Sequence, residues 1–209
     1  MTTTGIVIAV MMVIPTLSVA LNLYLTVKGT RGDIWMSPAL RFTIFGTGGF
    51  VAYSILDSVI ALPALNEIVH FTHFTEGLGQ IGLYGFFSMV MFGAIYYMVP
   101  RLLKREWPSP TLIYLHFWGS ALGITVTVVA LLAGGWFEGV QMNDATVPFL
   151  EIVQSTIPWL KARSIGGVLL TVGHVAFAIN FFWMLFAMGS IRSKQGPTLL
   201  QSANQEGAA

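Results

Sequence analysis

The sequence contains no cysteine and very little charge. Without cysteine, disulfides, thiolate metal ligands and covalently attached c-type haem are excluded on this chain. Only 9% of the 209 residues are charged, whereas soluble domains carry roughly 25%. There is also no basic patch with interleaved aromatic residues, so nucleic-acid binding is not indicated. What the chain has in abundance is apolar residues, at 55% with a mean hydropathy of +0.75, a composition typical of membrane proteins.

Five apolar segments are long enough to cross a bilayer, for which a helix needs about 20 mostly apolar residues. They are residues 5–27, 42–62, 77–99, 112–134 and 165–191. Because backbone polar groups in lipid must bond within their own segment, these long uncharged runs favour helices over barrel strands. The first residues lack a basic region, so the first segment is expected to be a retained helix rather than a cleaved signal peptide. We predict one all-α membrane domain over 1–194 and a flexible cytoplasmic tail over 195–209.

The distribution of basic residues predicts the orientation of these spans. With five spans, Lys161 and Arg163 fall on one side, and the other eight of the ten basic residues fall on the opposite side: Lys28, Arg31, Arg41, Arg101, Lys104, Arg105, Arg192 and Lys194. The positive-inside rule then places the N-terminus outside and the C-terminus in the cytoplasm. Two loops are predicted on the outer side, over 63–76 and 135–163. The second is predicted to include a short helix lying on the membrane surface, with one apolar face formed by Val147, Leu150, Val153 and Ile157.

A few polar residues inside the spans are candidates for function. Asp57 is an acid near the outer end of the second span, where intramembrane acids often mark function, although hydration at the interface is the simpler interpretation. His116 begins the fourth span and is interpreted as a hydrogen-bonded packing residue. His174 lies deeper, and a buried imidazole needs partners. A hydroxyl, a carbonyl or a haem iron are all open alternatives there, with an ordinary hydrogen bond favoured.

His70 and His73 precede the third span. Three residues apart on a helix, they would share a face. A stable metal site would need a third ligand such as Glu67 or Glu76, so the pair alone is a weak candidate and no metal is predicted. The glycines of the third and fourth spans favour close helix packing over space for a flat cofactor.

The stretch HFTHFTEGLGQIGLYGFFSMVMFGAIYYMVPRLLKREWPSPTLIYLHFW, residues 70–118, resembles part of a known family. It is similar to the tenth and eleventh helices, with their connecting loop, of the catalytic subunit of C-family (cbb-type) haem–copper oxidases. The resemblance continues through GGWFEGVQM and SIGGVLLTVGHVAFAIN, and SPALRF fits the start of the ninth helix. It covers roughly residues 37–188. It implies that the five spans correspond to the last five helices of a twelve-helix protein.

In that family the tenth helix carries the pattern T-x-G-H-A-H-L-G-L-Y-G-F-F. Its two histidines bind the high-spin and the low-spin haem, on opposite sides of the helix, because residues i and i+2 point about 200° apart. In the same register this chain has Leu78 and Gln80. Leucine cannot coordinate iron, and glutamine is a poor haem ligand beside imidazole. The upstream histidines lie about two turns, or roughly 11 Å, away.

The resemblance therefore implies no cofactor at Leu78 and Gln80, with His174, His73 and His70 as weak candidates. The family's first seven helices, which carry its copper ligands, cross-linked tyrosine and second axial haem ligand, have no counterpart in this sequence. We predict a non-catalytic subunit of a respiratory or electron-transfer complex in the bacterial inner membrane. Its expected partners are other membrane subunits, lipid and a cytochrome c, with no nucleic acid.

Two alternatives remain open at this stage. In the first, the chain is one half of a split cbb-type oxidase, reducing oxygen or nitric oxide, with the missing helices on another chain and haem b held through ligands such as His174. The second, a conduit for ions or small molecules, rests only on the polarity of Asp57, Gln80 and Glu76. In the favoured interpretation, Phe86, Phe87 and Met89, or lipid, fill the vacated haem space.

Overall fold

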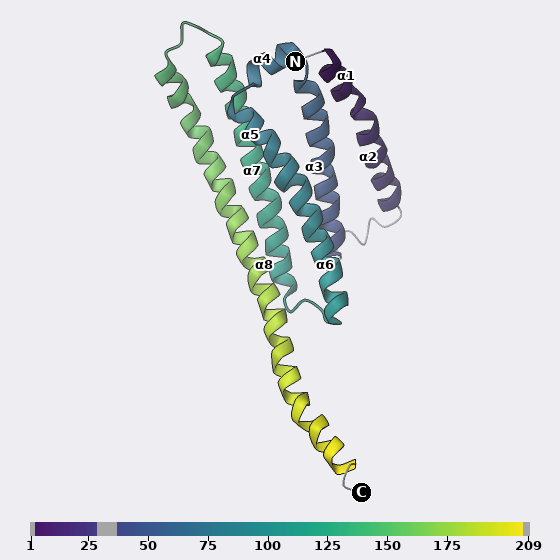
Figure 1. Ribbon diagram of the computed structural model, residues 1–209. Helices are drawn as coiled ribbons and strands as arrows, with labels where there is room; N and C mark the ends of the chain where they lie inside the picture. The colour runs from purple at the N-terminus through teal and green to yellow at the C-terminus, as the bar shows by residue number, and fades with distance from the viewer. Residues whose placement is uncertain (1–2, 29–36, 207–209) are drawn as a thin grey trace.

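The computed structural model describes residues 3–28 and 37–206, with side chains placed as far as Phe186 except at residue 9. All regular elements in these residues are helices (Figure 1). In chain order they are α1 (Thr3–Met11), α2 (Val13–Val27), α3 (Pro38–Ile60), α4 (Pro63–Val69), α5 (His73–Gln80), the π-helix η1 (Ile81–Ser88), α6 (Met89–Leu103), α7 (Pro110–Met142) and α8 (Phe149–Glu206).

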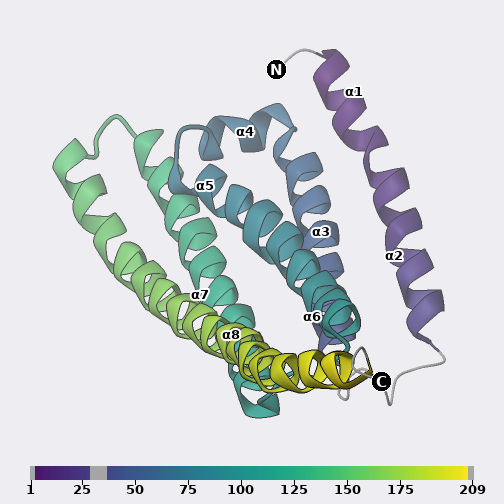
Figure 2. The same cartoon turned by 60° about the horizontal axis from the view of Figure 1, so that its bottom comes forward.

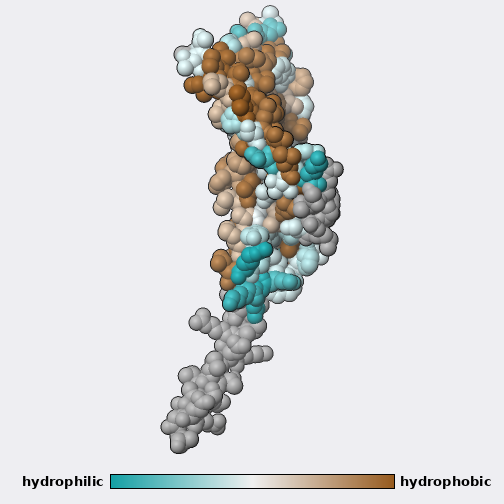
Figure 3. Space-filling view, turned by 90° about the vertical axis from the view of Figure 1, so that its right-hand side faces the viewer, coloured by the Kyte–Doolittle hydropathy of each residue, from teal (hydrophilic) through white to brown (hydrophobic). Residues whose placement is uncertain are grey.

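The five predicted spans are confirmed. Five stretches of the described residues are long and apolar enough to cross a membrane: Thr3–Val27, Pro38–Ile60, His73–Leu103, Pro110–Met142 and Phe149–Phe186. They lie side by side, and the two chain ends are at opposite ends of the bundle (Figure 1). Seen from the side of α2, hydrophobic residues cover the upper part of the molecule, and hydrophilic residues gather above the grey C-terminal segment (Figure 3). Which end faces the cytoplasm stays a prediction.

Two Ser-Pro pairs start the helices that run upward in Figure 1. Ser37 and Ser109 each precede a proline at the first helical position. Their hydroxyls accept hydrogen bonds from the backbone N–H groups of Leu40 and Leu112, at 3.4 and 3.3 Å. A serine cap satisfies a free N–H of the first turn, and proline has no N–H to leave unpaired. Both helices consequently begin a few residues before the apolar runs that predict them.

The two predicted outer loops are mostly helical, so both loop predictions are wrong in extent. The first contains α4 and the start of α5. The second shrinks to residues 143–148, because α7 runs on to Met142 and α8 begins at Phe149. The proposed surface helix is the first part of α8. Packing between the two helices explains the extension, since Gly134 fits against Trp159 and the Ser155 hydroxyl donates to the Gln141 side chain at 2.8 Å.

Helices α7 and α8 share the most extensive interface of the bundle. Glycines allow it: a Cβ added at Gly119 would lie 3.0 Å from the Cα of Gly173, and one at Gly123 would lie 2.8 Å from the carbonyl oxygen of Gly166. Small residues bring membrane helices into van der Waals contact in this way. Viewed from below, α1 and α2 stand on the far side of α3 from α7 and α8 (Figure 2). The first span is mostly exposed, with Thr16 its buried residue.

The hydrophobic core joins α3, α6 and α7. Its buried members are Phe42, Met89, Tyr96, Ile113, Phe117 and Ala121. Beyond the bundle, α8 continues as a helix to Glu206 (Figure 1). Residues 195–206, predicted as tail, are thus helical, whereas 207–209 lie outside the described residues. The flexibility of this segment stays a prediction.

Candidate functional site

The helix that carries the oxidase-like motif changes form directly after Gln80. There α5 gives way to the π-helix η1, over Ile81–Ser88. The Ser88 hydroxyl donates to the carbonyl of Leu83, five residues back, at 2.9 Å. Helix α3 approaches this segment closely, since a Cβ added at Gly49 would lie 2.5 Å from the carbonyl oxygen of Gly85. π-Helical turns are rare and are frequent at functional sites.

Leu78 and Gln80 lie in the turns just before η1 and differ in environment. Leu78 is buried, with 6% of its surface exposed, and Gln80 is half-buried. Among the residues expected to fill a haem space, Met89 belongs to the buried core and Phe86 packs against Phe50, with ring centroids 5.0 Å apart. Phe87 is exposed.

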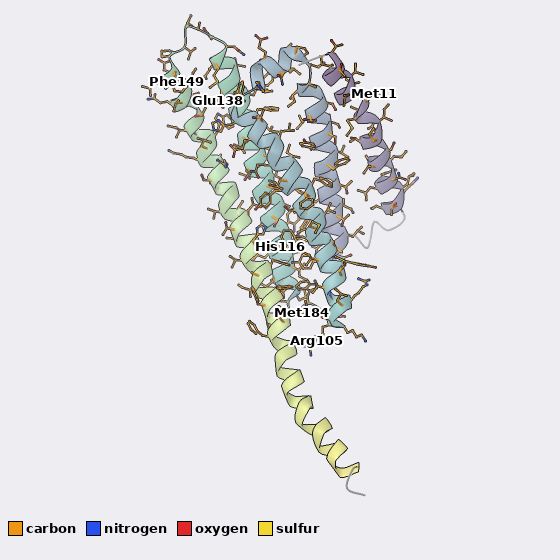
Figure 4. All side chains as sticks on the ribbon, in the orientation of Figure 1. Met11, Arg105, His116, Glu138, Phe149 and Met184 are labelled. Carbon is orange, nitrogen blue, oxygen red and sulfur yellow. The ribbon has the colours of Figure 1, made fainter. Side chains whose placement is uncertain are left out.

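A histidine–glutamate pair links α5 to α7 at the upper end of the bundle. The backbone N–H of His73 donates to Oε2 of Glu138 at 2.9 Å, and its ring Nδ1 lies 2.6 Å from the same oxygen. Glu138 is buried and is labelled near the top of α7 in Figure 4. Thr72 caps α5 locally by accepting from the N–H of Phe74, and the Glu138 carboxylate adds an acceptor for the first N–H of the helix from α7. A second pair, Arg163 Nη2 to Glu76 Oε1 at 2.6 Å, joins α5 to α8.

His70 and His73 do not share a helix face, which corrects the expectation from their spacing. α4 ends at Val69, Phe71 takes the left-handed conformation with φ of 65°, and α5 starts at His73. His70 is exposed, whereas His73 is committed to Glu138, and Glu76 is paired with Arg163. Within residues 3–28 and 37–186, no three His, Asp or Glu side chains are grouped to hold a metal ion.

His116 and Tyr96 form a buried polar pair inside an aromatic cluster. The Tyr96 hydroxyl lies 2.9 Å from Nδ1 of His116, which is fully buried in the lower part of the bundle (Figure 4). The rings of Phe42, Phe92 and Phe177 surround the imidazole at centroid distances of 4.9, 4.5 and 5.0 Å. Its Nε2 has no partner among the described residues. This arrangement fits the interpretation of His116 as a hydrogen-bonded packing residue.

His174 lies beside this cluster, at the edge of a groove. Its ring centroid is 5.6 Å from that of His116, and its Nδ1 lies 2.6 Å from the carbonyl oxygen of Leu170. The groove, of about 490 Å³, runs between η1 and α8. It is lined by Tyr84, Gly167, Leu170, Thr171, His174, Val175 and Ala178. Asp57, in α3, is exposed.

The family model described as "Cytochrome C and Quinol oxidase polypeptide I" matches residues 1–169. The chain belongs to this family. It is 26% identical over 204 residues to the cytochrome c oxidase subunit 1 homolog of Azorhizobium caulinodans, an alignment covering 94% of this chain and 37% of the relative. It is 27% identical over 183 residues to the Cbb3-type cytochrome c oxidase subunit CcoN1 of Stutzerimonas stutzeri, covering 84% and 39%. A nitric oxide reductase subunit of Stutzerimonas stutzeri is 24% identical over 141 residues, covering 63% and 30%.

The chain spans less than two-fifths of the length of the oxidase relatives it matches. The predicted resemblance to oxidase subunit I is thereby confirmed, as is an all-helical membrane fold. The residues at the expected haem-ligand positions do not fit a haem. Leu78 has no donor atom and is buried in packed protein, and the amide of Gln80 is a poor axial ligand.

Two features of this region escaped prediction from the sequence. The π-helix lies within the stretch GQIGLYGFFS, residues 79–88. Its glycines at 82 and 85 are the one sequence feature that could have indicated it, but glycine also occurs in ordinary membrane helices. The role of Glu138 was equally hidden, because its partner His73 is 65 positions away and the pairing depends on which helices are neighbours.

Proposed function

We propose that the chain is a non-catalytic, oxidase-subunit-I-like component of an electron-transfer complex in the bacterial inner membrane. The observation that carries this proposal is the pair Leu78 and Gln80 at the family's haem-ligand positions. Leu78 is packed at a position where a haem ligand is expected, and its side chain cannot coordinate iron. The helix would then keep its packing role in the bundle without binding haem. The fold around it keeps the glycine contacts and caps that a scaffold needs.

The outer surface of the bundle supports a role in contacting other membrane subunits. Large apolar residues on α8 are exposed along its length, among them Val168 at 63% and Val175 at 52%. Apolar surface inside a membrane faces either lipid or protein, so exposure alone does not choose between them. For a scaffold, we expect a neighbouring protein subunit along α8.

Optical spectroscopy on the native complex tests the absence of haem. The complex is purified through a tag on this chain, and reduced-minus-oxidised spectra are recorded before and after the chain is separated. We expect any b-type signal to remain with other subunits. A haem signal that follows the isolated chain and changes on Leu78→Ala or Gln80→Ala overturns the proposal, and Gly79→Ala, an open position between them, is the matched control.

Site-specific photo-crosslinking tests the scaffold. A photoreactive phenylalanine analogue is placed at Val168, which is exposed, and at Ala121, which is 4% exposed, as the buried control. We expect the Val168 probe to crosslink to another protein in intact membranes, and the Ala121 probe to give only intramolecular products. Crosslinks to lipid alone from Val168, and equally from Val175, contradict a scaffold that uses α8.

A second candidate, one half of a split oxidase, is favoured by the length comparison, since relatives are more than twice as long as this chain. In that case another chain supplies the remaining helices, and haem b depends on a ligand such as His174. A haem spectrum of the complex that disappears in His174→Phe, with assembly intact, supports this candidate against the scaffold.

A further inference from the structure

Arg41 is a buried cation without an anionic partner in the described part of the chain. The residue is 8% exposed, its Nε has no hydrogen-bond partner there, and it belongs to neither of the ion pairs found there. Its guanidinium carbon lies instead over two rings of α7, 5.6 Å from the centroid of Tyr114 and 5.4 Å from that of Phe117. Arginine is rarely buried unless it is paired. A ligand with negatively charged acceptor atoms would satisfy this side chain.

A second buried donor lies beside the same two rings. The Nε1–H of Trp118 has no acceptor among residues 3–28 and 37–186. The Trp118 ring centroid is 6.1 Å from that of Tyr114 and 5.4 Å from that of Phe117, so Trp118 shares both neighbours with Arg41. Indole and guanidinium groups donate hydrogen bonds and do not accept them. Two such donors, one of them charged, favour an anionic ligand with oxygen acceptors, such as a phosphate.

The position of Arg41 matches the depth of lipid headgroups. Arg41 is the fourth residue of α3, a helix of 23 residues and thus about 35 Å long. The hydrocarbon core is roughly 30 Å thick, so each end of α3 lies near an interface. Two more basic residues lie at this end of the bundle, Lys28 at the end of α2 and Arg101 in the last turn of α6 (Figure 1). Basic residues near the interface attract anionic lipids.

An apolar groove of about 350 Å³ leads from this level toward the middle of the bilayer. Residues within 45–52 of α3 form one wall and residues within 124–129 of α7 form the other, with Ile81 and Gly85 of η1 between them. In Figure 2 the continuous helix α5–η1–α6 lies between α7 and α3 in the same way. Three elements thus enclose the groove, and Thr125 is the one residue with a polar side chain that lines it.

The groove begins beside Arg41. Phe45 is the lining residue of α3 nearest to it in sequence, one helical turn further along. The Phe45 ring centroid lies 6.3 Å from that of Phe117, which is also the ring beneath the guanidinium. On α7, Trp118 precedes Thr125 by seven residues, which places both on one side of the helix. The donors and the groove therefore follow each other in the order of a phospholipid, with the headgroup at the interface and the acyl chain toward the centre.

We propose that this face of α3 and α7 binds an anionic phospholipid of the bilayer, with its phosphate at Arg41 and one acyl chain in the groove. The phosphate oxygens accept from the guanidinium and from the indole of Trp118, and their charge compensates that of the buried arginine. Free phosphate would supply the charge without filling the groove. The proposal concerns binding alone, and it goes beyond the scaffold role without depending on it.

Native mass spectrometry of the purified complex tests the proposal. The complex is isolated in detergent through a tag on this chain, and it is equilibrated with micelles that contain either phosphatidylglycerol or phosphatidylcholine at matched mole fractions. We expect one saturable phosphatidylglycerol per chain that depends on Arg41. Phosphatidylcholine, whose choline cation neutralises its phosphate, is expected to bind about fivefold more weakly. Inorganic phosphate is expected not to displace the lipid.

Charge variants locate the headgroup. Arg41→Gln keeps an amide donor but removes the charge, so the Kd for phosphatidylglycerol is expected to rise about fivefold, to the value for phosphatidylcholine. Arg41→Lys keeps the charge and is expected to retain the preference. Arg101→Gln is the matched control, because Arg101 is exposed at the same end of the bundle and its Nη1 already donates to the carbonyl oxygen of Tyr97 at 2.9 Å. Its binding is expected to be unchanged.

Groove variants locate the acyl chain. Val129 lines the groove and is 57% exposed, so Val129→Trp fills the groove without displacing packed atoms, and it is expected to weaken binding of both lipids. Val168→Trp is the matched control, because Val168 is 63% exposed on α8 and does not line the groove. Lipid binding by this variant is expected to equal that of the unmodified chain.

Several results overturn the inference. Equal Kd values for the two lipids, or an unchanged Kd for phosphatidylglycerol in Arg41→Gln, remove the phosphate from Arg41. Displacement by inorganic phosphate identifies an anion site that does not need lipid, and unaltered binding in Val129→Trp removes the chain from the groove. If Arg41→Gln keeps its lipid but releases another subunit, the guanidinium pairs with a protein acid instead. None of these results depends on haem or on crosslinks at α8, so the scaffold proposal is tested separately.

Discussion

Replacing Gly135 by alanine is the sharpest test of how α5 is held. A Cβ at Gly135 would lie 1.9 Å from the backbone nitrogen of Phe74, about 1.5 Å (3.4 minus 1.9) short of the distance at which ordinary contacts begin. The opposing atom is backbone, so no side-chain rotation relieves the clash. Helix α5 must move away from α7, and the two hydrogen bonds between His73 and Glu138 are then lost.

The expected cost follows from competing terms. Overpacking costs about 1–3 kcal/mol, and loss of hydrogen bonds to the buried carboxylate adds about 1.5–3 kcal/mol. Alanine is a better helix former than glycine by about 1 kcal/mol, which offsets part of this. The free energy of unfolding of Gly135→Ala is therefore expected to fall by about 1.5–5 kcal/mol.

The matched control is Gly167→Ala, where the added Cβ meets nothing within 4 Å. At that position only the higher helix propensity of alanine matters, so this variant is expected to be as stable as the unmodified chain or more stable by up to about 1 kcal/mol. Both are measured by titrating the folded chain in mixed micelles with sodium dodecyl sulfate and following helicity. If Gly135→Ala unfolds at the same detergent fraction as Gly167→Ala, the packing argument is refuted.

Three smaller predictions use the same molecule. Tyr96→Phe leaves both ring nitrogens of buried His116 unpaired and is expected to lower the free energy of unfolding by about 1–3 kcal/mol in the same titration, and an unchanged midpoint contradicts the pairing. Asn180→Leu removes the bonds that its amide makes to the N–H and C=O of Ser109, at 3.1 and 3.0 Å, and should speed proteolysis between α6 and α7; an unchanged cleavage rate argues against this clamp. Two hydrogen bonds from Thr146, the stronger from its hydroxyl and the other from its backbone N–H, hold the pKa of Asp144 below its usual 3.8. Its stabilising contribution is present above pH 3.8 and lost as the pH falls through the lowered pKa, so an NMR titration midpoint at or above 3.8 contradicts this account.

Much of the architecture is legible in short stretches of sequence. A run of about 20 apolar residues predicts each span. Such a run forms a helix because backbone groups in lipid must form their hydrogen bonds within the segment. The Ser-Pro pairs at 37–38 and 109–110 likewise mark two helix starts through interactions within four residues. The oxidase-like motif is also recognisable in the sequence, and its register along one helix predicts that Leu78 and Gln80 occupy the haem-ligand positions.

The errors arose where local pattern and long-range packing disagree. Residues 135–142 and 149–163 are poorer in long apolar runs and were expected to form a loop. They are helical because α7 and α8 pack against each other at Gly134 and Trp159, and this contact stabilises the added turns of both helices. The spacing of His70 and His73 suggested one helix face, but the left-handed backbone at Phe71 turns the chain between them.

Local sequence thus determined that this chain is a five-span helical membrane protein, and its register predicts Leu78 and Gln80 at the family's haem-ligand positions. The position of its polar groups was settled by helix neighbours far apart in the chain: Glu138 meets His73 across 65 positions and Asn180 meets Ser109 across 71. Burial and hydrogen-bond partner are properties of that assembled environment. His116 of α7 meets the hydroxyl of Tyr96 from α6 and the rings of Phe42 from α3 and Phe177 from α8, and only the folded bundle brings those residues together.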